Sequence, residues 1–146
     1  FDFYTNDNEL ASLSIIDQYR HSRSNRQPPQ DTTIDSIKEN ISKDESLHAS
    51  SIKEVRIGDE KGIELADGSC TDLLSGRGAT TEIACTASFT YHSNTTLRKG
   101  LDVEFFVDIV SAKIGNSLEH FNPYHFVDAN IITTVRKILS TFKFTK

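Results

Sequence analysis

The sequence has little of several residue types, and each shortage excludes a class of protein. It contains no Trp and only 7 Gly and 3 Pro in 146 residues. Because Gly and Pro are scarce, the chain is neither collagen-like nor a low-complexity linker. No apolar run approaches the ~20 residues of a membrane-spanning helix. The 16 Lys and Arg are outnumbered by 21 Asp and Glu, which gives a net charge of −5. Because nucleic acids and anionic membranes select basic surfaces, we expect no nucleic-acid partner and no direct membrane contact.

The residues that are present fit one domain of ordinary size. A chain of this length buries roughly two thirds of its unfolded surface, which is enough for one hydrophobic core. We therefore expect residues 1–146 to form a single domain. The chain does not begin with Met, and Phe1-Asp2-Phe3-Tyr4 has the pattern of a strand interior. We expect that a first strand or a cleaved leader precedes Phe1, and that any membrane tether lies there.

Alternating apolar residues predict an antiparallel sheet. Short β-rich runs at 1–4 and 11–16 flank a turn cluster and predict a hairpin. Further strands are expected at 52–57, 63–65, 83–91 and 101–110, with turns at 58–62, 67–68 and 93–96. In the last strand Val103, Phe105 and Val107 alternate with polar residues. This alternation indicates a sheet with one buried face and one partly wet face.

Two segments have the period of amphipathic helices. Isoleucines within 34–41 form one apolar stripe, and Asp31 or Thr32 would cap that helix. A second helix is expected over 126–140, with Asp128 as its cap. Because strands cluster along the chain and helices punctuate them, the sequence predicts an α+β fold around one antiparallel sheet, with the helices packed on it.

The order of these elements resembles that of PsbP-like domains (the PsbP/Mog1 type), which occur in many small exported bacterial proteins and lipoproteins. The end of the chain carries the likeness best, because a helix that finishes at Ile138-Leu139-Ser140 runs into Phe142-Lys143-Phe144, a short strand or docked tail. The resemblance implies an α/β/α sandwich and a non-enzymatic accessory or binding role. It assigns no functional residue to this chain.

The two cysteines, Cys70 and Cys85, form one disulfide or none. A bridge across a loop of this length would stabilise the fold by about 3 kcal/mol in the chain-entropy model. Two unpaired small hydrophobic side chains are the alternative. We expect the disulfide, and hence an extracytoplasmic location: secreted, periplasmic or on the cell surface. Asn94 begins the triplet Asn94-Thr95-Thr96, which matches the N-glycosylation pattern and makes it a candidate glycan site.

Three carboxylates share the polar face of the strand at 101–110. Asp102, Glu104 and Asp108 lie at i, i+2 and i+6, so their side chains point the same way. Oxygen ligands in this arrangement are a candidate site for Ca²⁺, the one cofactor that the sequence suggests. A carboxylate pair with one raised pKa would instead suit acid–base work. A solvated sheet face is the alternative to both.

Two histidines flank Pro123 in a loop. His120 and His125 are candidate bases or metal ligands, but their spacing matches no common ligand pattern, so ordinary loop histidines are the alternative.

One local cluster is basic. Arg20, Arg23 and Arg26 form a candidate docking site for an acidic protein partner, and a solvated loop is the alternative reading.

No catalytic motif accompanies these residues. The sequence has no nucleophile elbow, no zinc-protease helix and no Cys–His signature. It therefore favours a non-catalytic, exported binding or accessory domain whose partner is another extracytoplasmic protein. A subunit of a surface assembly is one alternative. A small secreted enzyme or toxin-like protein that uses the acidic face with His120 and His125 is the other. The sequence does not specify an oligomeric state.

Overall fold

The computed structural model describes residues 2–4, 10–17, 32–43, 52–72, 83–110, 123–125 and 127–144. Strands in these ranges are β1 (Asp2–Tyr4), β2 (Leu10–Asp17), β3 (Ile52–Ile57), β4 (Glu60–Asp72), β5 (Ile83–Ser93) and β6 (Leu101–Val110). Helices are α2 (Ile34–Lys43), α3 (Asn94–Lys99), the 3-10 helix η3 (Pro123–His125) and α4 (Ala129–Ser140). Among the described helices, none has the length and apolar character needed to cross a membrane.

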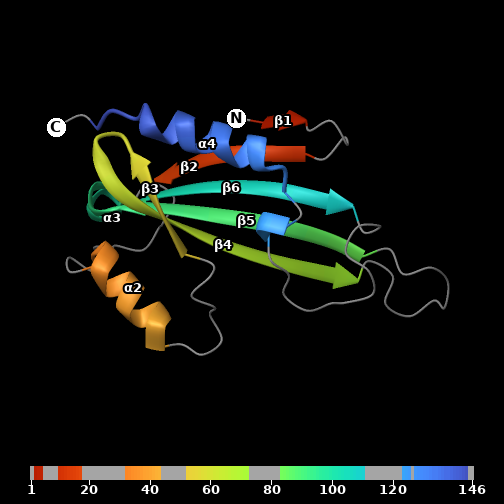
Figure 1. Ribbon diagram of the computed structural model, residues 1–146, viewed down its shortest axis with the longest axis horizontal. Coiled ribbons are helices and arrows are strands. Elements are labelled where there is room, and N and C mark those ends of the chain that lie inside the picture. Colours follow the sequence, from red (N-terminus) through yellow and green to blue (C-terminus); the bar gives the residue numbers. More distant parts are fainter. Residues whose placement is uncertain are drawn as a thin grey trace.

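All six strands form one antiparallel sheet in the order β1-β2-β6-β5-β4-β3 (Figure 1). Strands β3 to β6 pair in sequence order as a meander. The N-terminal hairpin, β1 and β2, joins the far side of that meander, where Leu13 of β2 lies opposite Phe105 of β6. The predicted α+β class, with helices packed on an antiparallel sheet, is therefore confirmed.

Helix α4 and η3 cover one face of the sheet, and the main core lies beneath them (Figure 1). Alternate positions of the central strands are fully buried, as the period-two pattern predicts. Helix α4 adds Ile132, Val135 and Leu139, which follow the helical period of one buried stripe. The strand residues of this core are Ala11, Leu13, Ile57, Ala66, Cys85, Ala87, Phe89, Tyr91, Val103, Phe105 and Val107.

Helix α2 lies beside β3 on the other side of the sheet. Lys38 of α2 donates a 3.0 Å hydrogen bond to Glu54, whose cross-strand partner is Ile63 on the face opposite to α4. The cap of α2 differs from the prediction of Asp31 or Thr32. Thr33 caps it, because its hydroxyl accepts the Ser36 N–H while the Ser36 hydroxyl accepts the Thr33 N–H.

Two predicted turns are wrong. Asp67 and Gly68 lie inside β4, where they pair with Ser88 and Ala87 of β5, so the neighbouring strand overrides their turn preference. The segment 93–96 opens helix α3 instead of forming a simple turn. Two other predictions hold, because Asp128 caps α4 and residues 142–144 form a docked tail without strand structure.

Candidate functional site: a cavity at one end of the sheet

A cavity of about 890 Å³ opens where the β3–β4 turn, α3 and the C-terminal end of α4 meet, at the left end of Figure 1. The antiparallel pairing of β3, β4 and β5 brings the turn beside α3, and a hydrogen bond from Gly58 to Leu139 joins the turn to the end of α4. The residues that line the cavity are Asp59, Glu60, Thr95, Arg98, Lys99, Ser140, Thr141, Phe142, Lys143 and Phe144.

Gly58 fixes the β3–β4 turn against the end of α4. It has φ +60°, a conformation that glycine adopts at little cost in a two-residue hairpin. Its N–H donates a 2.8 Å hydrogen bond to the carbonyl of Leu139. A Cβ at this position would lie 2.4 Å from the carbonyl oxygen of Phe142, so only glycine allows this close approach. The turn and the C-terminal tail are thereby held together as one wall of the cavity.

Helix α3 forms a second wall through its caps. Ser93 and Thr96 form a reciprocal capping box, and Gly100 ends the helix with φ +64°. Glu60 accepts hydrogen bonds from the backbone N–H of Thr95, at 3.2 Å, and from its hydroxyl. The hydroxyl bond is the main cause that lowers the pKa of Glu60. Glu60 is therefore ionised at neutral pH and binds the first turn of α3.

The C-terminal tail supplies the apolar part of the cavity. Helix α4 ends at Ser140, and the next residue, Thr141, caps it by donating its N–H and its hydroxyl to the carbonyl of Ile138. Phe142 and Phe144 are half-buried and pack against the hydrophobic core, while Lys143 between them is exposed. The extended tail thus places its two rings on the inner side and its cation on the rim.

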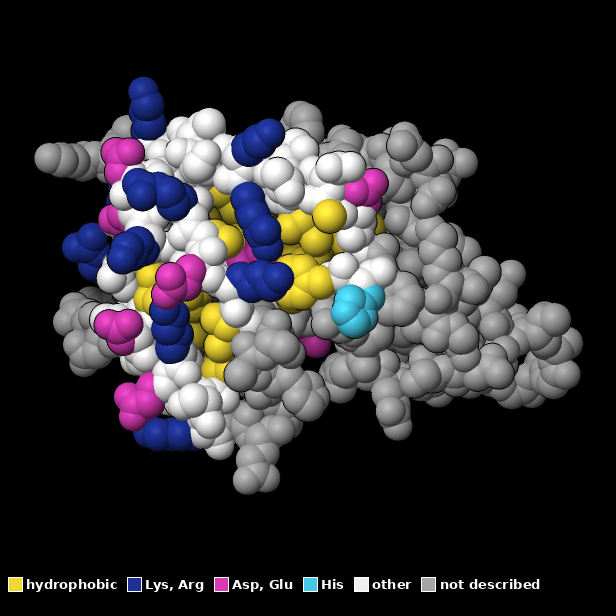
Figure 2. Space-filling view, viewed as in Figure 1, with side chains coloured by type: hydrophobic (Ala, Val, Ile, Leu, Met, Phe, Trp, Pro, Cys, Tyr) yellow, Lys and Arg dark blue, Asp and Glu magenta, His cyan; other side chains and the backbone are white. Residues whose placement is uncertain are grey.

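The rim is basic. Arg98, Lys99 and Lys143 are exposed, and the Lys99 Nζ lies 6.0 Å from the centroid of the Phe144 ring. Figure 2 shows Lys and Arg side chains, interspersed with Asp and Glu, beside hydrophobic side chains at this end of the molecule. Two acidic residues, Asp59 and Glu60, also line the cavity. This combination of rings and excess cations is suited to bind an anionic molecule that has an apolar body.

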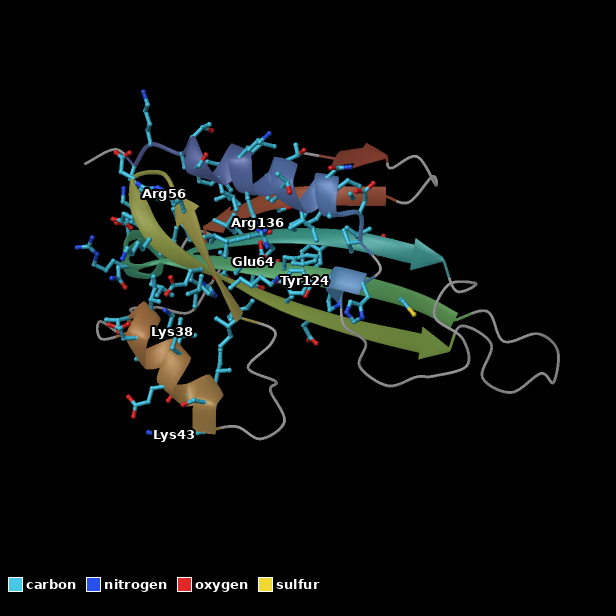
Figure 3. The ribbon with its side chains drawn as sticks, in the orientation of Figure 1. Lys38, Lys43, Arg56, Glu64, Tyr124 and Arg136 are labelled. Atoms are coloured by element: carbon cyan, nitrogen blue, oxygen red, sulfur yellow. The ribbon has the colours of Figure 1, made fainter. Side chains whose placement is uncertain are left out.

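A second cluster of ionisable groups lies under α4. The carboxylate of Glu64 has no exposed surface and is bound through both oxygens by Arg136 of α4, at 3.0 and 2.7 Å. The Tyr124 hydroxyl of η3 donates to the same carboxylate at 2.6 Å. Figure 3 shows these three side chains converging between the sheet and the helices. The cluster connects β4, η3 and α4.

The ionisation of this cluster is fixed by its own contacts. Burial opposes the charge on Glu64, but hydrogen bonds from Arg136 and Tyr124 outweigh it, so the pKa of Glu64 lies below its ordinary value. Tyr91, directly opposite Glu64 on β5, has a raised pKa because it is buried beside that carboxylate. Its hydroxyl makes no hydrogen bond of normal geometry with any described residue. Glu64 is therefore an ionised anchor for the helices.

The structure brings the two cysteines together. Cys70 of β4 lies directly opposite Cys85 of β5 in the strand register. Directly opposed residues in antiparallel strands have Cα atoms about 4.5–5.5 Å apart, which is within the range that a disulfide spans. Cys85 is buried, and the described part of the chain contains no free cysteine.

The three predicted carboxylates do share one face of β6. Asp102 lies close enough to Glu104 to contribute, after burial, to a raised pKa of Glu104. Asp108 lies further along the strand and accepts a 3.3 Å hydrogen bond from the Thr86 hydroxyl. Within the described ranges, no group of three or more His, Cys, Asp or Glu side chains is placed to hold a metal ion. The calcium site stays a prediction.

The other predicted residues are scattered. Asn94 is exposed at the start of α3, where its side-chain oxygen accepts the Ile34 N–H at 3.1 Å. His125 is exposed on η3, away from the acidic face. The basic cluster Arg20, Arg23 and Arg26, and His120, lie outside the described residues.

Sequence reasoning missed both the cavity and the buried cluster. Glu64 lies in the predicted strand at 63–65, and its neighbours Ile63 and Leu65 gave no signal that it faces the core. Ile63 is buried on the opposite face, and Glu64 points to the core. The aromatic tail at 142–144 was the one signal for the cavity, since a docked tail was expected there.

Comparisons with known proteins give no relative for this geometry. No protein-family model, curated protein or solved structure matches the chain.

Proposed function

We propose that this chain is an exported, non-catalytic domain that binds a small molecule in the cavity at the end of its sheet. The observation that carries the proposal is the cavity itself. Its volume of about 890 Å³ falls within the roughly 300–1,000 Å³ of typical small-molecule sites, and two aromatic side chains, Phe142 and Phe144, lie among the polar and charged residues that line it.

The state of the buried cluster supports a non-catalytic role. A general acid or base needs a lone pair or a proton that a substrate can reach. The Glu64 carboxylate is instead enclosed and held by Arg136 and Tyr124. The pKa of Glu64 is lowered, away from neutral pH, whereas the pKa of a catalytic acid or base is commonly shifted toward neutral pH. These contacts suit an anchor better than a reactive centre.

Export is part of the proposal, and the cysteine register supports it. A disulfide between Cys70 and Cys85 would join directly opposite residues of β4 and β5. Stable disulfides of this kind occur in oxidising compartments. The same role, an exported accessory or binding domain, is the one that the PsbP-like resemblance implies.

The test is to fill the cavity with a large side chain and to measure whether a fluorescent dye still binds. The neutral dye N-phenyl-1-naphthylamine brightens when it enters an apolar site, and the wild-type protein should bind it saturably at one site. Ser140→Trp places a large side chain at the cavity wall and should abolish this binding. Thr133→Trp, on the exposed surface of the same helix, is the matched control and should bind normally.

The outcomes separate the candidates. Loss of dye binding in Ser140→Trp alone supports the proposal. Absence of binding in the wild type, or equal binding in both variants, would refute the cavity as a small-molecule site. A subunit of a surface assembly would then be the favoured alternative.

A further inference from the structure

The charge of the cavity indicates what kind of molecule it would hold. Three exposed cations, Arg98, Lys99 and Lys143, face two acidic residues around one opening. The chain as a whole carries a net charge of −5, so this local excess of positive charge runs against the overall balance. A local reversal of sign focuses attraction on a small anion at that point.

One of the two acidic groups is already compensated. Glu60 accepts two hydrogen bonds from Thr95 at the first turn of α3, and Arg98 also lowers its pKa. Arg98 in turn donates a 3.2 Å hydrogen bond to the Thr95 hydroxyl, which holds its guanidinium at this wall. The charges of Glu60 and Arg98 therefore offset each other within the wall, which leaves Lys99 and Lys143 against Asp59 at the opening.

The C-terminal end of α4 should repel an anion less than a helix end whose last carbonyls are unpaired. The last carbonyls of a helix carry partial negative charge and disfavour anions. Here the Leu139 carbonyl accepts the N–H groups of Gly58, at 2.8 Å, and Phe142, at 3.1 Å. The Ile138 carbonyl accepts the N–H and the hydroxyl of Thr141. These donors satisfy two of the last carbonyls of α4 beside the cavity and so weaken their partial negative charge.

From this arrangement we infer that the ligand is an anionic aromatic or similarly flat apolar molecule, with its carboxylate, sulfonate or phosphate at the basic rim. The inference rests on the proposed function, because it assumes that the cavity binds a small molecule. The rings of Phe142 and Phe144 would contact the apolar body. Lys143, which lies between them and points outward, would meet the charged group together with Lys99.

The test compares two dyes that share one body. The anion 8-anilinonaphthalene-1-sulfonate has the same anilinonaphthalene frame as the neutral N-phenyl-1-naphthylamine and adds one sulfonate. The wild type should bind the anion about tenfold more tightly in low salt, and 0.5 M NaCl should reduce that ratio to about twofold by screening. Lys143→Gln should weaken the anion about threefold and leave the neutral dye unchanged. Lys137→Gln, an exposed lysine of α4 outside the cavity, is the matched control and should change neither dye.

Each result has one meaning. If both dyes bind with equal affinity, and Ser140→Trp blocks both, the cavity is a ligand site and the anionic preference is wrong. If the wild type does not bind the neutral dye, the proposed function itself fails. If Lys137→Gln weakens the anion as much as Lys143→Gln does, the attraction is a general surface effect and the rim has no special role.

Discussion

Replacing Arg136 with Met should destabilise the fold by about 3 kcal/mol, because it leaves the Glu64 carboxylate buried without its guanidinium. The change removes two hydrogen bonds from a side chain with 0% exposure. Removal of one partner of a buried ion pair costs about 3–5 kcal/mol, and we expect the lower end because 35% of the Arg136 side chain is exposed and water can enter. Since a domain of this size is stable by roughly 5–15 kcal/mol, the variant should still fold.

Urea denaturation at pH 7 measures the loss, with the midpoint shifted and the slope unchanged. The double variant Glu64→Gln/Arg136→Met removes the buried charge as well, so it should recover part of the stability that the single change loses. Lys137→Met, at the next and exposed position of α4, is the matched control and should stay within about 0.5 kcal/mol of the wild type.

Acidification provides an independent signature of the same cluster. In the wild type the pKa of Glu64 lies below its ordinary value of 4.5, so its contribution to stability is present above about pH 4.5 and is lost as the pH falls through the lowered pKa. Without Arg136, burial is less opposed and the pKa of Glu64 should rise. The difference between wild type and Arg136→Met should therefore shrink on acidification. A loss below about 1 kcal/mol, or an equal loss at pH 7 and pH 4, would refute the reasoning.

Three further substitutions test the cavity walls and the sheet. Gly58→Ala should destabilise by about 2 kcal/mol, since it combines a positive φ with a Cβ 2.4 Å from the Phe142 carbonyl, and an unchanged melting temperature would contradict that contact. Cys85→Ser should lose about 3 kcal/mol if Cys70 is its disulfide partner, and two free thiols in the wild type by non-reducing mass spectrometry would remove that expectation. Ser93→Ala should lose about 1 kcal/mol in urea denaturation by removing the cap of α3, and a change under 0.3 kcal/mol would show that the cap contributes little.

Much of the sheet was predictable because period-two patterns report burial directly. Strands β3, β5 and β6 were predicted within two residues of their bounds, and β5 and β6 bury alternate residues as their patterns predict. Strand β4 was predicted to end too early. Asp67 and Gly68 favour turns locally, but their pairing with β5 is a long-range contact that no local preference reveals.

The candidate site was much less predictable. Helix α3 has six residues, NTTLRK, with no apolar stripe. Its caps and a hydrogen bond to Glu60 of β4 stabilise it. Glu64 and Arg136 are separated by 72 positions and become partners only when α4 lies over β4. Linear spacing gives no signal for side chains that separate segments of the chain bring together.

The strand order also has a consequence for how the chain reaches this fold. Strands β3, β4, β5 and β6 each pair with the next in sequence, so this meander can form from local contacts. Strand β2 pairs only with β1 and β6, and joining Asp17 to Leu101 closes a loop that contains α2, β3, β4, β5 and α3. That closure is entropically unfavourable until β6 is already in place. We therefore expect the N-terminal hairpin to join the sheet after the meander has formed, and the edge of β6 that pairs with β2 to stay open until then.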